Sequence, residues 1–278
     1  MKNLSLLFAL LFSLVVSAQE TRRAEIFPNN HPEILIGKTV KVKPLPEKFR
    51  DKGYPNFYTD ALAMKTYSKI DYKKSSADSL ENKVFKVVSN DTKYPEILKL
   101  ESAEGEIIYY ELNKYDKSEY YFEVEGDLDL PEGFYCEYFQ PGLDEGKKMS
   151  KMTKSIWGVI VWLHNNIQTD KLEVDLMLAM PTTASKGVTV IFDNGEKLEL
   201  PNIKLDGKLN DGSREHKNCI YKITTDKEKK LFTENIITTI IFGKEKTPVN
   251  SDIPSMHGEI IRGVVECSFK TIEEKNKL

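Results

Sequence analysis

Short blocks in which apolar and polar residues alternate are the feature that most limits how this chain can fold. In residues 171–180 every second side chain is apolar, whereas Glu173 and Asp175 fall on the opposite face of an extended strand. Similar blocks recur at residues 40–42, 83–88, 97–100, 107–112, 119–124, 157–163, 188–192, 218–223, 236–242 and 259–269. Because alternation between turn residues is typical of antiparallel sheet, the sequence predicts a mostly β protein.

A polar, turn-rich stretch, QPGLDEGKKMS, breaks this pattern at residues 140–150 and indicates a linker. We therefore expect two domains, and the predicted segments are an N-terminal extension (19–32), a small Src-homology-3-like β-barrel (33–140), a linker (141–153), an antiparallel β-sandwich-like domain (154–272) and a tail (273–278). A single domain is the alternative, since β-sandwiches reach this length.

The first eighteen residues have the form of an export signal. Lys2 gives a positive start, residues 4–16 form an apolar run, and small residues end at Ala18, where signal peptidase cuts. The run is shorter than the roughly 20 residues of a membrane-spanning helix, and no cysteine follows the cut to accept a lipid. We expect processing between Ala18 and Gln19 and a periplasmic or extracellular protein without a transmembrane anchor; an uncleaved anchor is the alternative.

Charge and cysteine content narrow the function classes. Of the 40 basic and 43 acidic residues, cleavage removes only Lys2, so the net charge passes from −3 to −4. The basic residues are interspersed with acids, which argues against nucleic-acid binding. Cys219 and Cys267 are the only pair that we consider for a disulfide, but both fit core positions, so we expect all three thiols to be free. Cys136, in a less regular stretch, is expected to be the more exposed thiol.

Two hairpins and one short helix are specified by local signals. At residues 189–201, TVIFDNGEKLELP, a calcium loop fails because its ligand positions would fall on apolar residues. A three-residue loop ending at Gly195 in the left-handed region instead gathers the apolar side chains on one face. The same device is expected at residues 103–105. Thr225 and Glu228 fit a capping box that starts a helix, which we expect Asn235 to end in the left-handed conformation.

No catalytic residue, cofactor site or metal site is predicted. Gly37-Lys38-Thr39 lacks the first glycine of a phosphate loop and is interpreted as the start of a strand. His164, next to Trp162, fits the end of a strand better than a metal site. Acidic residues of equal parity at 123, 125, 127 and 129 would form a carboxylate stripe on an extended chain, and a solvated strand face explains them more simply than a cation site.

Aromatic density before the linker is the most suggestive feature. Tyrosine joins apolar area to a polar tip and suits contact surfaces. The candidate ligand-binding residues are Tyr120, Tyr121, Phe134, Tyr135 and Tyr138. Burial of these rings between the two domains is the alternative.

The chain resembles uncharacterised secreted two-domain β-rich proteins of Gram-negative bacteria. The resemblance rests on segments 37–40 and 107–110 of the first domain and on segments 191–195, 223–228 and 234–238 of the second. It implies two β domains and no known activity. We therefore expect an exported, non-catalytic protein that binds an envelope or extracellular partner, either protein or glycan. The alternatives are an exported hydrolase whose site is assembled only in the fold, and a structural envelope component.

Overall fold

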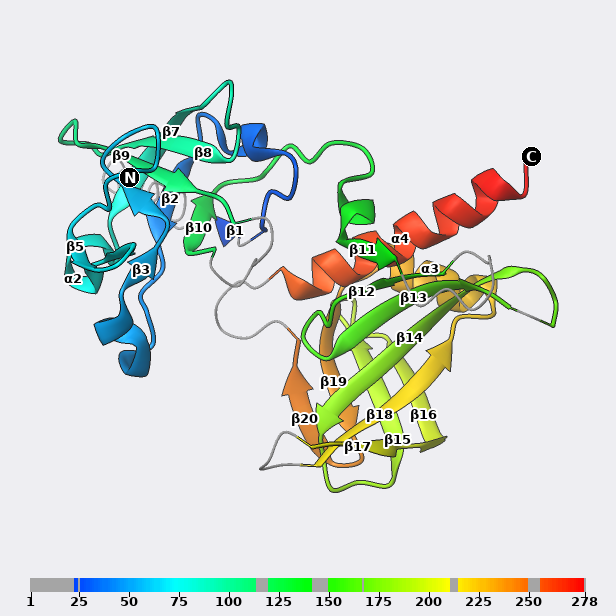
Figure 1. Cartoon of the computed structure of the whole chain (residues 1–278). Helices are drawn as coiled ribbons and strands as arrows, with labels where there is room; N and C mark the ends of the chain where they lie inside the picture. Colours follow the sequence, from blue (N-terminus) through cyan, green and yellow to red (C-terminus); the bar gives the residue numbers. More distant parts are fainter. Residues whose placement is uncertain are drawn as a thin grey trace, which may run out of the picture. The chain divides into compact units, whose positions relative to one another are not determined.

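The structure is a computed structural model that describes residues 23–24, 26–113, 120–141, 150–166, 168–210, 215–249 and 256–277 (Figure 1). It is mostly β, with 42% strand and 21% helix, and its four sheets are antiparallel. The chain divides into two compact units, Met1–Asp129 and Leu130–Leu278. The boundary between the units lies before the predicted linker, which begins at residue 141. The processing site at Ala18 and Gln19 lies outside the described residues.

Unit 1 is built on an open seven-stranded sheet. Its strands, in spatial order, are β1 (Arg23–Ala24), β10 (Phe122–Glu125), β2 (Thr39–Val42), β7 (Val84–Asn90), β8 (Ile97–Glu101), β9 (Ile107–Glu111) and β4 (Phe57–Tyr58). A small sheet of β3 (Tyr54–Pro55), β6 (Lys74–Ser75) and β5 (Lys69–Asp71) accompanies it, with η1 (Pro32–Leu35), η2 (Glu47–Lys52) and α2 (Ala77–Leu80). Because the described strands begin at β1 and end at β4 without closing, the predicted barrel is corrected to an open sheet.

Aromatic rings from three strands form the centre of unit 1. Phe57, Tyr110 and Phe122 are fully buried, and their ring centroids lie 4.7 to 5.9 Å apart. The hairpin at residues 103–105 has the predicted register, because Leu98 pairs with Tyr110 and Gly105 has a φ of +84°.

The described residues of unit 2 form two sheets and three helical segments. The six-stranded sheet runs β11 (Phe139–Pro141), β12 (Ser150–Thr153), β13 (Val159–Asn165), β14 (Leu172–Pro181), β18 (Glu215–Lys222) and β17 (Asp206–Asn210). The four-stranded sheet runs β16 (Lys197–Lys204), β15 (Lys186–Phe192), β19 (Ile237–Phe242) and β20 (Glu245–Pro248). The helical segments are η4 (Phe134–Tyr138), α3 (Asp226–Glu234) and α4 (His257–Lys275). Since β11 pairs with β12, residues 134–140, which the sequence had placed in the first domain, belong to this unit.

The β15–β16 hairpin has the predicted three-residue loop. Val190 pairs with Leu198, the Phe192 N–H donates to the Glu196 carbonyl at 3.0 Å, and Gly195 has a φ of +84°. Asp193 is also a hydrogen-bond acceptor for a distant segment, because its Oδ1 accepts a hydrogen bond from the Ile236 N–H at 3.0 Å. The loop is thereby fixed to the segment that leads into β19.

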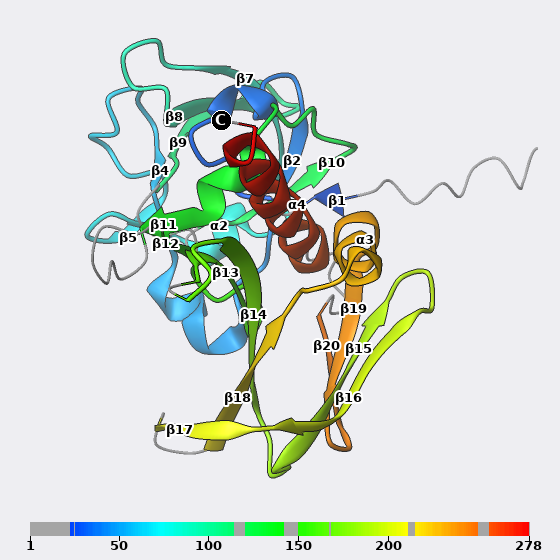
Figure 2. The same ribbon diagram turned by 90° about the vertical axis from the view of Figure 1, so that its right-hand side faces the viewer.

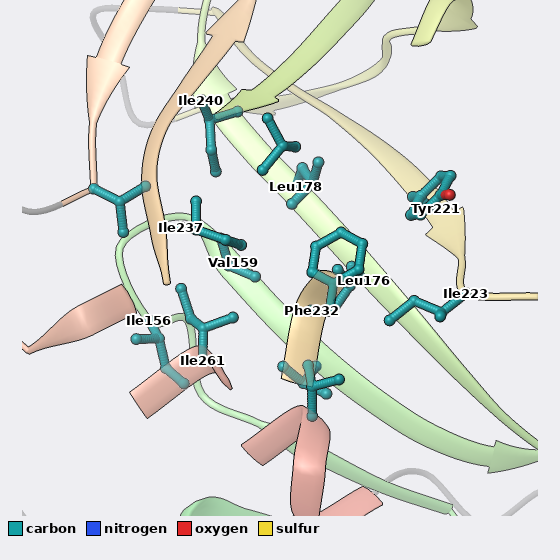
Figure 3. Packing of buried hydrophobic residues seen from close by; sticks show 14 of the residues in the cluster. Ile156, Val159, Leu176, Leu178, Tyr221, Ile223, Phe232, Ile237, Ile240 and Ile261 are labelled. Atoms are coloured by element: carbon teal, nitrogen blue, oxygen red, sulfur yellow. The ribbon is translucent and has the colours of Figure 1, made fainter. Parts of the chain in front are cut away.

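The inner faces of the two sheets share one hydrophobic core, which α3 and α4 cover at one end (Figures 2 and 3). Leu176 of β14, Ile240 of β19 and Ile261 of α4 all lie in this core. The capping box of Thr225 and Glu228 is present, and Phe232 is buried as predicted. Asn235 is extended, with a φ of −124°, so the predicted left-handed helix end is wrong.

Two predictions about residues 259–269 are also wrong. These residues form most of the 19-residue helix α4 and not a strand, because the side chains of Ile260, Ile261 and Val264 repeat at helical spacing along one buried side. Cys267 on this helix forms a disulfide with Cys136 of η4, and their Cα atoms lie 5.6 Å apart. Cys136 is therefore not an exposed thiol, and Cys219 is free and buried.

Candidate functional site on the outer face of the six-stranded sheet

The five aromatic residues singled out from the sequence divide between the two units. In unit 1, Tyr120 is buried beside Phe122, with ring centroids 5.7 Å apart, and Tyr121 packs edge-on against Tyr54. In unit 2, Phe134 is buried on η4, and the partly buried rings of Tyr135 and Tyr138 pack on the hydrophobic core. Much of each ring is engaged within its own unit.

Tyr135 has a structural role in joining η4 to α4. A Cβ atom added to Gly263 of α4 would lie 2.1 Å from Cδ2 of Tyr135, so the ring lies directly on the helix backbone. The neighbouring Cys136 continues this joint through its disulfide with Cys267. The absence of a side chain at Gly263 permits this close approach.

The acidic stripe at residues 123–129 is interrupted. Strand β10 ends at Glu125, and Gly126 has a φ of +83°, so the chain turns where an extended stripe requires it to continue. Lys38 donates through Nζ to the carbonyl oxygen of Asp127 at 2.7 Å. Strand β2 begins at Thr39, so the segment Gly37-Lys38-Thr39 is the start of a strand, as predicted.

A different group of polar residues comes together on the outer face of the six-stranded sheet. Alternate residues of each strand point away from the hydrophobic core, and the register brings them into rows across neighbouring strands. His164 of β13 pairs with Ser150 of β12 and with Glu173 of β14. In the next row Trp162 pairs with Asp175, and Asp175 pairs with Lys222 of β18.

These residues form two neighbouring groups of contacts, which together we call the outer-face network. His164 Nε2 lies 3.0 Å from Asp175 Oδ2, and its ring centroid lies 4.2 Å from the nearer ring of Trp162. Glu173 accepts hydrogen bonds from Lys222 Nζ and, at 2.8 Å, from Asn166 Nδ2. The Trp162 indole N–H donates to Ser150 Oγ at 3.0 Å. The network comprises Ser150, Trp162, His164, Asn166, Glu173, Asp175 and Lys222.

One carboxyl side chain of the network is buried. Asp175 is only 6% exposed, and its Oδ1 has no hydrogen-bond partner among the described residues. The hydrogen bond from Lys222 is the main cause that lowers the pKa of Glu173, so this carboxylate stays ionised. Burial of a carboxyl group with an unsatisfied oxygen costs stability, and this feature makes the network the candidate functional site.

An apolar row borders the network. Ile160 of β13 pairs with Met177 of β14, which in turn pairs with Ile220 of β18. Ile220 is 52% exposed, and the other two side chains are partly exposed. The outer face therefore presents an apolar centre beside a polar, charged border.

This site was not predicted from the sequence. Alternation had placed Glu173 and Asp175 on a polar strand face and His164 at a strand end, but no local signal joined them or included Lys222. The only hint was the period-two spacing of Glu173 and Asp175 with the Trp162-x-His164 pair.

Comparisons with known proteins give no match to this chain: no protein-family model, no curated protein and no solved structure corresponds to it. In the part of the chain that the structure describes, no helix is both long and apolar enough to cross a membrane.

Proposed function

We propose that this chain is an exported, non-catalytic protein that binds a protein partner through the outer face of its sandwich-like second unit. The observation that carries the proposal is the row Ile160, Met177 and Ile220 beside the outer-face network. Protein interfaces combine such an apolar centre, often with Trp and Met, with a polar rim. Aromatic and methionine side chains supply contact area, and the charged neighbours select the partner.

Export is supported by two features. The Cys136–Cys267 disulfide suggests an oxidising, extracytoplasmic location. Residues 1–18 have the length and the small-residue ending of a cleaved signal peptide.

A pull-down from an envelope extract of the host tests the proposal. The bait is the wild-type chain, the Ile220→Glu variant, or the Ile107→Glu variant as a matched control. Ile107 lies on β9 of unit 1 and is 43% exposed, so both substitutions place a carboxylate on an exposed strand position. We expect one stoichiometric protein that is retained by wild type and Ile107→Glu and lost with Ile220→Glu. Retention by all three baits, or glycan capture alone, would contradict a protein-binding face.

A second candidate function, hydrolysis, is favoured by one feature. Ser150, His164 and Asp175 lie on the same face of three neighbouring strands, and His164 already contacts Asp175. A serine nucleophile needs a histidine within hydrogen-bond reach, whereas Ser150 Oγ accepts from the Trp162 indole. Turnover of activated esters that disappears in Ser150→Ala would establish hydrolysis; turnover unchanged in Ser150→Ala would argue against it.

A further inference from the structure

We propose that His164, Glu173 and Asp175 bind one divalent transition-metal ion, for which zinc is the probe. This inference rests on the proposed function only in placing a binding site on the outer face of the six-stranded sheet. The metal would lie at the polar border of that face, beside the apolar row.

The three side chains offer a compact set of ligand atoms. One nitrogen or oxygen atom from each residue lies within 4.8 Å of the others. Tetrahedral zinc with bonds of about 2.0 to 2.2 Å holds its ligand atoms roughly 3.3 Å apart. His164 and Glu173 are directly paired across two neighbouring strands, and Asp175 follows two residues along β14. Small side-chain rotations are therefore enough to close the site.

A second observation that points to a ligand is the state of Asp175. Its side chain is 9% exposed, one oxygen contacts His164 Nε2, and Oδ1 has no hydrogen-bond partner among the described residues. An unsatisfied carboxylate oxygen in such a place is costly. A metal ion held by this carboxylate and by the imidazole, with the imidazole proton on Nδ1, removes that cost.

The ammonium group of Lys222 is a cation that would compete with the metal ion for Glu173. This ammonium group contacts Glu173 in the structure, and the Lys222 side chain is 41% exposed, so it can turn into solvent. A metal ion and Lys222 would compete for the same carboxylate. Removal of this amine should therefore strengthen metal binding, which a purely structural ion-pair network does not explain.

The donor set indicates the class of metal. One imidazole and two carboxylates suit zinc or manganese, whereas calcium prefers an all-oxygen site with six or more ligands. Three protein ligands leave a position for water or for a group of the partner, as in open zinc sites. A partner carboxylate or imidazole at that position would couple metal binding to partner binding.

The test is calorimetric titration of the full chain, purified without a histidine tag and stripped with chelator, using zinc chloride alone. We expect one zinc per chain, a weakening of tenfold or more in His164→Gln and in Glu173→Gln, and a severalfold tightening in Lys222→Met. His31→Gln is the matched control, because His31 Nδ1 also lies 3.0 Å from a carboxylate, that of Glu33, but belongs to no three-ligand group among the described residues. Near-ultraviolet circular dichroism of each variant establishes that it is folded.

Absence of zinc binding, or equal affinity in wild type and folded His164→Gln, would overturn the metal site. A Lys222→Met variant that binds no more tightly would also overturn it, because the ion would then not share Glu173. The proposed function and the metal site can fail independently. If the wild-type chain binds no zinc but Ile220→Glu loses the partner, the protein interface stands and the metal site is refuted. If the chain binds zinc but captures no partner, the metal site stands and the protein interface is refuted.

Discussion

Removal of the Cys136–Cys267 disulfide by a double serine substitution should destabilise unit 2 strongly. The bridge joins residues 131 positions apart, and the chain-entropy relation gives about 5 kcal/mol for a loop of that length. Because α4 also keeps its core contacts through Ile261 and Val264, the reduced ensemble retains some order and the loss is smaller. We expect the free energy of unfolding to fall by about 2 to 5 kcal/mol.

Tryptophan fluorescence during urea denaturation measures this loss in the correct unit. Both tryptophans of the chain, Trp157 and Trp162, lie in unit 2, so their fluorescence reports the unfolding of unit 2 and not that of unit 1. With a urea dependence of about 2 kcal/mol per M, the midpoint should fall by about 1 to 2.5 M. Wild type in dithiothreitol should unfold at the same urea midpoint as the double variant. The midpoint of the double variant should not change when dithiothreitol is added. A double variant that unfolds at the wild-type midpoint would refute the reasoning.

Three further results are expected. Burial raises the pKa of the Cys219 thiol to about 11, so a thiol reagent at pH 8 should find no reactive group in the folded oxidised protein and one after denaturation; three would show that the disulfide is absent. Burial alone would raise the pKa of Glu228, but hydrogen bonds from Tyr221 and from the Thr224 and Thr225 backbone lower this pKa to about 2. The stabilisation of the folded state by ionised Glu228 is therefore complete above the unfolded pKa of 4.5 and is lost as the pH falls toward 2. Glu228→Gln should cost about 1 to 2 kcal/mol at pH 7 and little at pH 2, and a constant cost in thermal melts at both pH values would contradict this. Gly195→Val places a β-branched residue at a φ of +84° and should cost about 1 to 3 kcal/mol, whereas an unchanged melting temperature would argue against the bulged loop.

Local signals were enough to predict the hairpins and the capped helix. A strand face repeats every two residues, and a glycine after Asp193-Asn194 sets the loop length, so the register of β15 and β16 follows from burial. The capping box of Thr225 and Glu228 likewise lies within four consecutive residues.

Helix α4 was not predictable by the same means. Its buried residues Ile260, Ile261, Val264 and Val265 are β-branched, and such residues favour strands by intrinsic preference. Packing of one helical side on the shared core overrides that preference. The error over Cys267 had a different cause. The sequence-based boundary assigned Cys136 to the first domain, whereas Cys136 lies with Cys267 in unit 2.

The outer-face network also required the fold. Sequence parity puts Glu173 and Asp175 on one strand face, but only the pairing of β14 with β13 brings His164 to them. Lys222 arrives from β18, 49 residues after Glu173, through the pairing of β14 with β18. Long-range register of this kind is set by burial over the whole sheet.

The most direct measurement for the central proposal is photo-crosslinking in living cells from position 220. A benzoylphenylalanine in place of Ile220, on the outer face of the six-stranded sheet, should give one crosslinked protein band that mass spectrometry identifies. The same residue at position 107, on unit 1 and similarly exposed, should not give that band. Identical crosslinks from both positions, or none from position 220, would contradict the proposal that the outer face binds a protein partner.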